Sequence, residues 1–484
     1  MATAIPQNRV PFTLEEIARA TGGEVRVGRA REVAGITTDS RADVEGKLFV
    51  ALSGEHFDGH AFAGDVGTRG ARIVLLERDV EVPSDLSVVR VPSTLAALGA
   101  LALFHRKRWA GTLVAIAGSA GKTTTRSAVS ALLAGILGEK VHFERGNLNN
   151  LIGVPMVLFG LGPEHDVAVV EVGTNQRGEV ARLGAMVAPD VAVVTLIGIE
   201  HSEGLGDLDE IQAEEGDLYR ALGRAGTAVG NADDARVMQE LDRSLVSEKL
   251  TYGSSPRAGY RLLARRSLPG FRSALSVARP TGEDLHFETG LHGVPGALAL
   301  CAALAVAERV TGRALDASEL DAGLELLGSG EPGRLTPIEL LDGSVVLDDS
   351  YNANPPSMLA SAETAKELAR ARGARLLFVV GEMRELGPLS EREHAAVGRA
   401  LADMQPDALV AVGGDAAHLA AAASAGATLS SGEVHVWDTQ EITLQATGDY
   451  ANPYAEVECW IQLEGPGFAR RVFGFWDGGR IFKV

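Results

Sequence analysis

A glycine-rich stretch with one lysine, GSAGKTTT, offers the most specific chemistry in the sequence. Gly118 and Gly121 let the backbone approach an anion closely, and the free amide groups at a helix N-terminus favour phosphate. Lys122 can reach the β- and γ-phosphates of a nucleotide, and the Thr123 hydroxyl can bind Mg²⁺. The strict phosphate-loop pattern requires glycine where this chain has Ile116. We still predict a nucleotide-binding loop, because a strand-forming segment precedes it and a helix-forming segment follows it.

Two further side chains that can contribute to a magnesium site follow apolar, β-branched segments. Glu171 ends the segment VAVVE, and His201 follows VAVVTLIGIE. Ligands of open α/β sheets gather at the carboxyl ends of the parallel strands, so we expect both residues near the loop. Taken singly, a solvated loop acid and a surface histidine are the commoner interpretations of such residues.

These residues depend on a regular alternation of strands and helices for their positions. The segments TLVAIAG, DVAVVEVG and DVAVVTLIG each precede a helical pattern, and the alternation resumes at RLLFVVGEM and DALVAVGG. Buried strands joined by helices predict a parallel sheet covered on both faces, and therefore an α/β protein. We divide the chain into an N-terminal domain (1–108), a central nucleotide-binding domain (109–315), a third α/β domain (316–438) and a tail (439–484).

Composition excludes several classes of protein. The 484 residues carry a formal net charge of −19, which argues against a nucleic-acid surface. The two cysteines lack metal-ligand spacing and suit a reducing compartment. We see no secretory signal and no apolar run long enough to span a bilayer. The sequence therefore predicts a cytoplasmic protein.

An ordered set of motifs resembles the Mur ligases, the ATP-dependent amide-forming enzymes of peptidoglycan precursor synthesis. The motifs are the glycine-rich loop, NLNNLIGVP (147–155), EVGTN (171–175), IGIEHSEG (197–204) and LDDSYNANP (347–355). The segment TTDSRADVEGKLFVALSGEHFDGHAF (37–62) resembles the UDP-muramoyl-binding domain of this family. The resemblance implies a three-domain α/β architecture with a central parallel sheet built around the phosphate loop and a Rossmann-like third domain.

The motifs DSYNANP and VVGEMRELG are similar to those of the members that add D-alanyl-D-alanine to UDP-N-acetylmuramoyl-tripeptide. This implies an ATP- and Mg²⁺-dependent reaction through an acyl phosphate, carried out by a monomer without a nucleic-acid partner. The alternatives are a ligase that adds diaminopimelate or lysine, and a catalytically impaired chimera that acts only as a binding protein. A folylpolyglutamate-type ligase shares the loop but lacks the TTDSR domain.

The resemblance also implies roles for individual residues. The expected catalytic residues are Lys122, Glu171, His201 and Glu215, and the expected metal ligands are Thr123, Glu171 and His201. The expected ATP contacts are Gly118, Ser119, Ala120, Gly121, Lys122, Thr123, Thr124, Arg334 and Asp349. The expected substrate contacts are Ser40, Arg41, Asn150, Asn352 and Asn354.

Three departures from the family pattern stand out. Glu215 occupies the place of a lysine that the family carbamylates, and it can supply carboxylate oxygens directly, with Glu214 and Asp217 as alternatives. Gly293 and Gly296 stand where the family has asparagines that meet adenine. The third departure is the end of the chain.

Residues 441–484 do not continue a Mur ligase. They alternate as strands with turn signals at ANP, EGPG and DGG, and they resemble the start of a β-sandwich module found in some glycoside hydrolases. We expect these strands to have little core of their own. We also expect the third domain to expose apolar surface, because its final strand and helix are missing.

Overall fold

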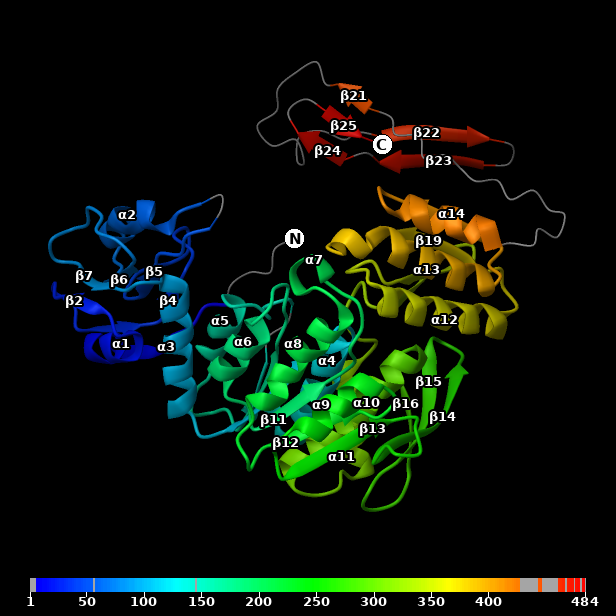
Figure 1. Cartoon of the computed structure of the whole chain (residues 1–484), viewed down its shortest axis with the longest axis horizontal. Helices are drawn as coiled ribbons and strands as arrows, with labels where there is room; N and C mark the ends of the chain where they lie inside the picture. Colours follow the sequence, from blue (N-terminus) through cyan, green and yellow to red (C-terminus); the bar gives the residue numbers. More distant parts are fainter. Residues whose placement is uncertain are drawn as a thin grey trace.

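The computed structural model describes residues 6–54, 57–143 and 146–426, and the backbone of short strands beyond residue 442. Three bodies follow one another along the chain, and Figure 1 shows the N-terminal domain joined to the central domain through α3. The three-domain α/β architecture that the sequence predicts is confirmed.

The N-terminal domain is built on a five-stranded sheet in the order β2-β7-β6-β5-β4, in which only the β2–β7 pair is antiparallel. The first helix begins after Thr13, whose hydroxyl caps it, and ends at Gly22 in the left-handed conformation. The elements are β1 (Pro11–Thr13), α1 (Leu14–Thr21), β2 (Glu24–Arg26), β3 (Glu32–Ala34), β4 (Ile36–Thr37), β5 (Leu48–Val50), η1 (Gly59–Phe62), α2 (Ala63–Thr68), β6 (Ile73–Leu76), β7 (Ser87–Arg90) and α3 (Thr94–Arg108).

The central domain carries a nine-stranded sheet in the order β16-β15-β14-β13-β12-β11-β8-β10-β9. It is parallel from β9 to β14, and antiparallel β15 and β16 extend it. The elements are β8 (Thr112–Ala117), α4 (Lys122–Leu137), η2 (Gly138–Lys140), β9 (Val141–Phe143), α5 (Gly153–Leu158), β10 (Val167–Glu171), α6 (Glu179–Val187), β11 (Val191–Val194), α7 (Ser202–Leu205), α8 (Leu208–Arg220), β12 (Thr227–Asn231), α9 (Ala235–Arg243), β13 (Glu248–Gly253), β14 (Tyr260–Leu268), β15 (Arg272–Ala278), β16 (Leu285–Thr289) and α10 (Gly293–Thr311).

Both faces of the central sheet are buried. Leu113 and Ala115 of β8 join the core that extends through α3 into the N-terminal domain, whereas Val114 and Ile116 join the core beneath α4 and α10. Helix α10 is long and apolar enough to cross a membrane, contrary to our expectation that the chain has no such segment. Most of it is buried inside the protein, so it serves as a core helix.

The third domain is smaller and less continuous than the Rossmann-like sheet that we expected. Its described strands form two separate pairs, β17–β18 antiparallel and β19–β20 parallel. The elements are α11 (Ala317–Leu327), β17 (Thr336–Glu339), β18 (Val345–Asp348), α12 (Pro355–Arg372), β19 (Leu377–Gly381), η3 (Gly387–Leu389), α13 (Ser390–Asp403), β20 (Ala408–Val412) and α14 (Ala416–Gly426).

The expected boundary at residue 316 assigns helix α11 to the third domain, but the helix packs on the central domain. Its residues Leu320 and Leu327 belong to the same buried core as Leu132 of α4. We therefore propose that the third domain begins after α11, because a domain is a unit with its own core.

One face of the β19–β20 pair is exposed. Val379 of β19 has 73% of its surface exposed, and Leu377, Val410 and Val412 are exposed as well, whereas Phe378 between them is buried against α13 and α14. Alternate residues of a strand face opposite sides, so no residue that the structure describes covers one apolar side of the pair. This agrees with the expected apolar exposure in this domain.

The tail forms strands, as predicted. β22 (Trp460–Gly465) pairs with β23 (Phe468–Phe473), and β25 (Ile481–Lys483) pairs with both β21 (Thr443–Gln445) and β24 (Phe475–Gly478). All of these pairings are antiparallel.

Candidate functional site

The glycine-rich loop is held in a fixed shape by the end of the neighbouring strand. Gly118 and Gly121 have φ of 124° and 84°, in the left-handed region that favours glycine. The Thr195 hydroxyl, just beyond β11, lies 2.6 Å from the carbonyl oxygen of Ala120 and 3.2 Å from that of Ala117. A Cβ at position 118 would come within 2.2 Å of that hydroxyl. The backbone can therefore take this turn only with glycine.

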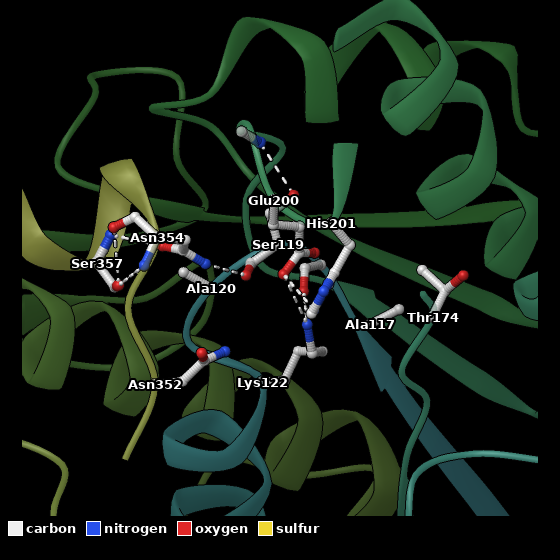
Figure 2. Close-up of polar contacts among 12 residues, drawn as sticks. Ala117, Ser119, Ala120, Lys122, Thr174, Glu200, His201, Asn352, Asn354 and Ser357 are labelled. Atoms are coloured by element: carbon white, nitrogen blue, oxygen red, sulfur yellow. Dashed lines mark hydrogen bonds and ion pairs between the residues drawn. The ribbon is translucent and has the colours of Figure 1, made fainter. Parts of the chain in front are cut away.

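Lys122 stands inside a group of buried carboxylates. Its ammonium donates a hydrogen bond to the carbonyl of Gly118 at 2.5 Å and lies 3.6 Å from Oε2 of Glu200, as Figure 2 shows. Burial lowers the pKa of Lys122, but attraction to Glu200, Glu215 and Glu171 outweighs burial and raises the pKa above its ordinary value. Lys122 is therefore a cation at neutral pH, as contact with nucleotide phosphates requires.

Three carboxylates around this lysine have oxygens that lack a hydrogen-bond partner among the residues that the structure describes. They are both oxygens of Glu215, Oε1 of Glu200 and Oε2 of Glu171. Burial raises the pKa of Glu200 and Glu215, and their mutual repulsion adds to the rise for Glu200. Buried acidic oxygens without partners are costly unless a cation joins them.

The site fits Mg²⁺ bound jointly with phosphate. Within the described chain, no group of three or more His, Cys, Asp or Glu side chains could hold a metal by itself. Mg²⁺ is commonly bound by one or two carboxylates together with waters and substrate phosphates, so a complete protein cage is not required. The buried oxygens of Glu171, Glu200 and Glu215 and the hydroxyl of Thr123, which is also buried, are suitable donors.

The structure distinguishes among the three acids of α8. Glu214 accepts hydrogen bonds from the amides of Gly178 at 2.7 Å and Val180 at 2.8 Å, and so holds the start of α6. Asp217 pairs with Arg220 on its own helix. Of the three, Glu215 is the one whose buried carboxylate lies beside Lys122 and Glu200.

His201 lies beside the same carboxylates. Its Nε2 is 3.8 Å from Oε2 of Glu200, and its Nδ1 is 2.5 Å from Oε2 of Glu385 in the third domain. The structure thus brings Lys122, Glu200 and His201 together, as Figure 2 shows. Sequence analysis missed Glu200, although it directly precedes His201 in the motif.

Two neighbouring asparagines make different contacts. Asn150, whose contact with substrate stays a prediction, accepts hydrogen bonds from the amides of Ile152 at 3.1 Å and Gly153 at 2.8 Å, in the turn that leads into α5. Asn149 instead donates a hydrogen bond at 2.9 Å to Oε1 of Glu171. Sequence alone could not separate these adjacent residues, because both lie in the same loop.

A cavity of about 640 Å³ lies between the central and third domains. The loop residues Ala120, Gly121 and Thr124 line it from one side, and Arg334 and Asp349 line it from the other. These residues, predicted to contact ATP, therefore face one another across a space large enough for a small ligand.

Both third-domain residues are held in place. Asp349 accepts hydrogen bonds from the amide of Leu335, at 3.0 Å, and from the hydroxyl of Ser361. The Arg334 guanidinium lies 4.1 Å from the ring centre of Tyr351. Burial raises the pKa of Asp349 above its ordinary value.

The glycines that replace the expected asparagines also belong to this region. Gly296 lines the cavity, and a Cβ there would lie 2.8 Å from Cβ of Leu291. Gly293 has a φ of 67°, and a Cβ on it would come within 2.2 Å of the Thr364 hydroxyl. The wall at this point is therefore built for glycine, and it supplies no side-chain amide from these two positions.

The remaining predicted substrate residues are not gathered around Lys122. Asn354 caps α12 and donates a hydrogen bond at 3.1 Å to the carbonyl of Ser119, so it joins the third domain to the loop (Figure 2). Asn352 is exposed. Ser40 and Arg41 lie in the N-terminal domain, where Arg41 pairs with Asp39.

Comparison with known proteins places these features in one family. Residues 32–106 match the Mur ligase family catalytic domain, 116–307 the Mur ligase middle domain and 333–454 the Mur ligase glutamate ligase domain. Residues 433–484 match a domain of unknown function, DUF5060, and this match overlaps the glutamate ligase domain match over 433–454. Our expectation that the ligase resemblance ends before residue 441 is therefore only partly supported: residues beyond 454 match DUF5060 and lie outside the three ligase matches.

Relatives resemble almost the whole chain. UDP-N-acetylmuramoyl-tripeptide–D-alanyl-D-alanine ligase of Escherichia coli is 34% identical over 94% of this chain and 99% of its own length. A crystal structure of MurF from Acinetobacter baumannii superposes with a TM-score of 0.77 at 30% identity, covering 86% of this chain and 88% of that one. MurF ligase of Thermotoga maritima in complex with ADP gives 0.69 at 26% identity, covering 79% and 86%.

Proposed function

The chain belongs to the Mur ligase family, and we propose that it is an ATP-dependent ligase that adds D-alanyl-D-alanine to UDP-N-acetylmuramoyl-tripeptide. The observation that carries this proposal is the charged Lys122 at a preformed phosphate loop, where three carboxylates surround it. The loop lines one side of a cavity, and residues of the third domain line the other side. The likeness to D-alanyl-D-alanine ligases along the whole length of the E. coli enzyme supports the choice of substrates.

The proposed reaction has two steps. A carboxylate oxygen of the tripeptide attacks the γ-phosphorus of ATP, the bond to the β–γ bridging oxygen breaks, and ADP leaves with that oxygen. The amine of the dipeptide then attacks the acyl carbon, inorganic phosphate departs, and the nitrogen loses a proton as the amide forms.

Lys122 and the loop amides act on the first step. They surround the phosphate as negative charge moves onto the bridging oxygen, and fixed positive groups in a water-poor site stabilise such charge strongly. Thr195 keeps the loop in this arrangement before the nucleotide arrives, because it bonds the carbonyls of Ala117 and Ala120. The binding groups therefore need little reorganisation.

Bound Mg²⁺ would neutralise phosphate charge and orient the oxygens for transfer. We propose that Thr123, Glu171 and His201 hold it, with Glu215 supplying the carboxylate that a carbamylated lysine would otherwise provide. Glu200, whose Oε2 lies 3.6 Å from Nζ of Lys122, is a fifth donor beside the same group. Asn149 fixes Glu171 by its hydrogen bond to Oε1, and Oε2 of Glu171 lies 3.6 Å from Nε of Arg126, with which bound Mg²⁺ would share it.

We propose that ATP bridges two domains. Its phosphates would lie on Gly118 to Thr124, and its nucleoside would extend along the cavity toward Arg334 and Asp349. The UDP portion of the other substrate would bind the N-terminal domain near Ser40 and Arg41, and the dipeptide would approach from the side of Asn352. Because these ligands are cytoplasmic precursors of wall synthesis, we propose that the enzyme works in the cytoplasm. We also propose that it acts as a monomer.

The test is release of phosphate by the purified chain with ATP, Mg²⁺, UDP-N-acetylmuramoyl-tripeptide and D-alanyl-D-alanine. We expect release to require all three substrates and to match formation of the pentapeptide product. Diaminopimelate or lysine, offered with the UDP-muramoyl-dipeptide, should not replace them. Activity only with that second pair would overturn the assignment in favour of the neighbouring ligase.

A second candidate function is binding without turnover. Two observations favour it: the exposed apolar face of β19–β20, and the match of residues 433–484 to a domain of unknown function. Together they indicate an altered third domain. Nucleotide binding at normal strength with no product in the assay above would support it.

A further inference from the structure

A loop of the third domain makes a direct side-chain contact with the candidate magnesium site. Nδ1 of His201 lies 2.5 Å from Oε2 of Glu385, in the loop between β19 and η3. Glu385 therefore reaches from one domain to a residue that stands beside Glu200 in the other. The contact between His201 and Glu385 has no part in the proposed catalytic steps.

The loop that carries Glu385 is anchored on both sides of it. Met383 and Leu386 are each 2% exposed in the third-domain core, and Ile199 of the central domain packs against the same core. The carbonyl of Glu385 accepts the amide of Glu203 at 3.0 Å, and the carbonyl of Leu386 accepts the Ser202 hydroxyl at 2.8 Å. The backbone of Glu385 is consequently held in place by contacts that do not involve its carboxylate.

Both partners adopt an unusual backbone conformation. His201 has a φ of 44° and Glu385 a φ of 60°, in the left-handed region that residues other than glycine seldom occupy. Such conformations persist where surrounding contacts fix them, and they concentrate at functional sites. Here each one turns its side chain toward the other domain.

The contact determines how His201 presents its second nitrogen. When Nδ1–H donates to Glu385, the lone pair of the neutral ring is on Nε2, and that atom faces Glu200 at 3.8 Å. A histidine that binds a metal usually donates its other N–H to a carboxylate or carbonyl, which fixes the ring and its tautomer.

We propose that Glu385 is a positioning residue that orients His201 toward the nucleotide-bound cation, so that docking of the third domain completes the metal site. The inference rests on the proposed function. It links two events that would otherwise be separate, closure of the third domain over ATP and assembly of the donors beside Lys122. A ligand that favours the closed arrangement would thereby favour the completed site as well.

The experiment compares Glu385→Ala and Glu385→Gln with the wild-type chain. Neither substitution removes the backbone groups that bond Glu203 and Ser202. Both place a residue other than glycine at the same left-handed position, so the two variants and the wild type carry a similar backbone cost. Glu382→Ala is the matched control, because Glu382 lies in the same loop and pairs only with Arg384 in the described part of the chain.

Two quantities are measured. One is kcat and KM for ATP as functions of Mg²⁺ concentration, and the other is the rise in melting temperature that Mg²⁺ produces with a non-hydrolysable ATP analogue. Loss of such a second-layer carboxylate typically costs about 10–100-fold in metal affinity or activity. We expect Glu385→Ala to lower kcat and raise the Mg²⁺ midpoint by that order, with a smaller change in KM. Glu385→Gln, which keeps an acceptor, should lie between it and wild type.

Wild-type kcat and an unchanged Mg²⁺ midpoint in Glu385→Ala would overturn the inference. His201→Ala separates this failure from failure of the proposed function. If His201→Ala is impaired and Glu385→Ala is not, only the positioning role is wrong. If His201→Ala also retains its Mg²⁺ dependence, the metal assignment itself is wrong.

Discussion

Nζ of Lys122 and Oε2 of Glu200 lie 3.6 Å apart at the centre of the candidate site, and both side chains are almost fully buried. Neither charge would be stable there alone, because an unpaired buried ion is costly. Further buried carboxylates surround the pair, and several of their oxygens accept no hydrogen bond from the described residues. The group as a whole can therefore bind an additional cation together with phosphate.

Replacing Lys122 by alanine should remove nearly all ligation. Loss of one fixed group that stabilises transition-state charge typically costs roughly 10²–10³ in kcat, or about 3–4 kcal/mol. The measurement is the steady-state rate of phosphate release. Lys140→Ala is the control, since that lysine is exposed and pairs only with Asp166 in the described chain. Turnover near the wild-type rate in Lys122→Ala would remove the loop from the mechanism.

Glu215→Gln should raise the Mg²⁺ concentration needed for half-maximal activity about tenfold or more, because a ligand charge is lost while the shape is kept. The wild-type chain should be indifferent to added bicarbonate, since no carbamate has to form on a glutamate. Asp217→Asn, two residues further along α8, provides the control. A Mg²⁺ titration of Glu215→Gln that matches wild type would make Glu215 a structural residue only.

Stability should fall as the pH is lowered from about 6.5 to 4, in part because of His142. Burial lowers the pKa of His142 to about 4, while the ring donates to the carbonyl of Val157 at 2.9 Å. Between these two pKa values the unfolded chain binds a proton that the folded chain does not, so unfolding becomes easier as pH falls. The difference amounts to roughly 3 kcal/mol at pH 4.

Urea unfolding of His142→Gln across this pH range is the check. The variant should show a weaker pH dependence than the wild-type chain, whereas His418→Gln, at an exposed position, should follow wild type. Parallel curves for His142→Gln and wild type would show that another group is responsible.

Deleting residues 441–484 should leave nucleotide affinity at the central loop within about twofold, because the groups that line the cavity all precede residue 371. Isothermal titration with an ATP analogue measures this. Replacing the tail after Asp438 by a Mur-type ending should raise both the melting temperature and the activity, since it would cover Val379 and its neighbours. Loss of ATP binding in a tail deletion whose central domain stays folded would place part of the site in the tail.

Much of the architecture could be predicted from local patterns. The strand before Gly118 and the helix after Lys122 are both explicit in the sequence, because apolar β-branched runs and helical periodicity are local properties. The boundary expected after residue 315 could not be placed by such local patterns. Helix α11 carries an amphipathic pattern that does not say which core it joins, and only tertiary packing shows that Leu320 faces α4.

The sequence predicted the main residues of the site but not the side chains that contact them. Lys122, Glu171, His201 and Glu215 lie in recognisable motifs, and their expected positions near one another follow from the rule on strand ends. Glu200, Asn149 and Glu385 were missed, since their roles depend on which side chain turns inward or which domain docks. The predicted substrate contact of Asn150 stays a prediction, and the sequence could not show that its neighbour Asn149 is the one that bonds Glu171.

The central claim is that this site transfers the γ-phosphoryl group of ATP to a substrate carboxylate before the amide forms. The direct measurement uses UDP-N-acetylmuramoyl-tripeptide labelled with ¹⁸O in its reacting carboxylate, together with D-alanyl-D-alanine, and follows the released phosphate by mass spectrometry. The account predicts one ¹⁸O atom in each phosphate and an equal amount of pentapeptide product. Phosphate that is released without the label, or without pentapeptide, would contradict it.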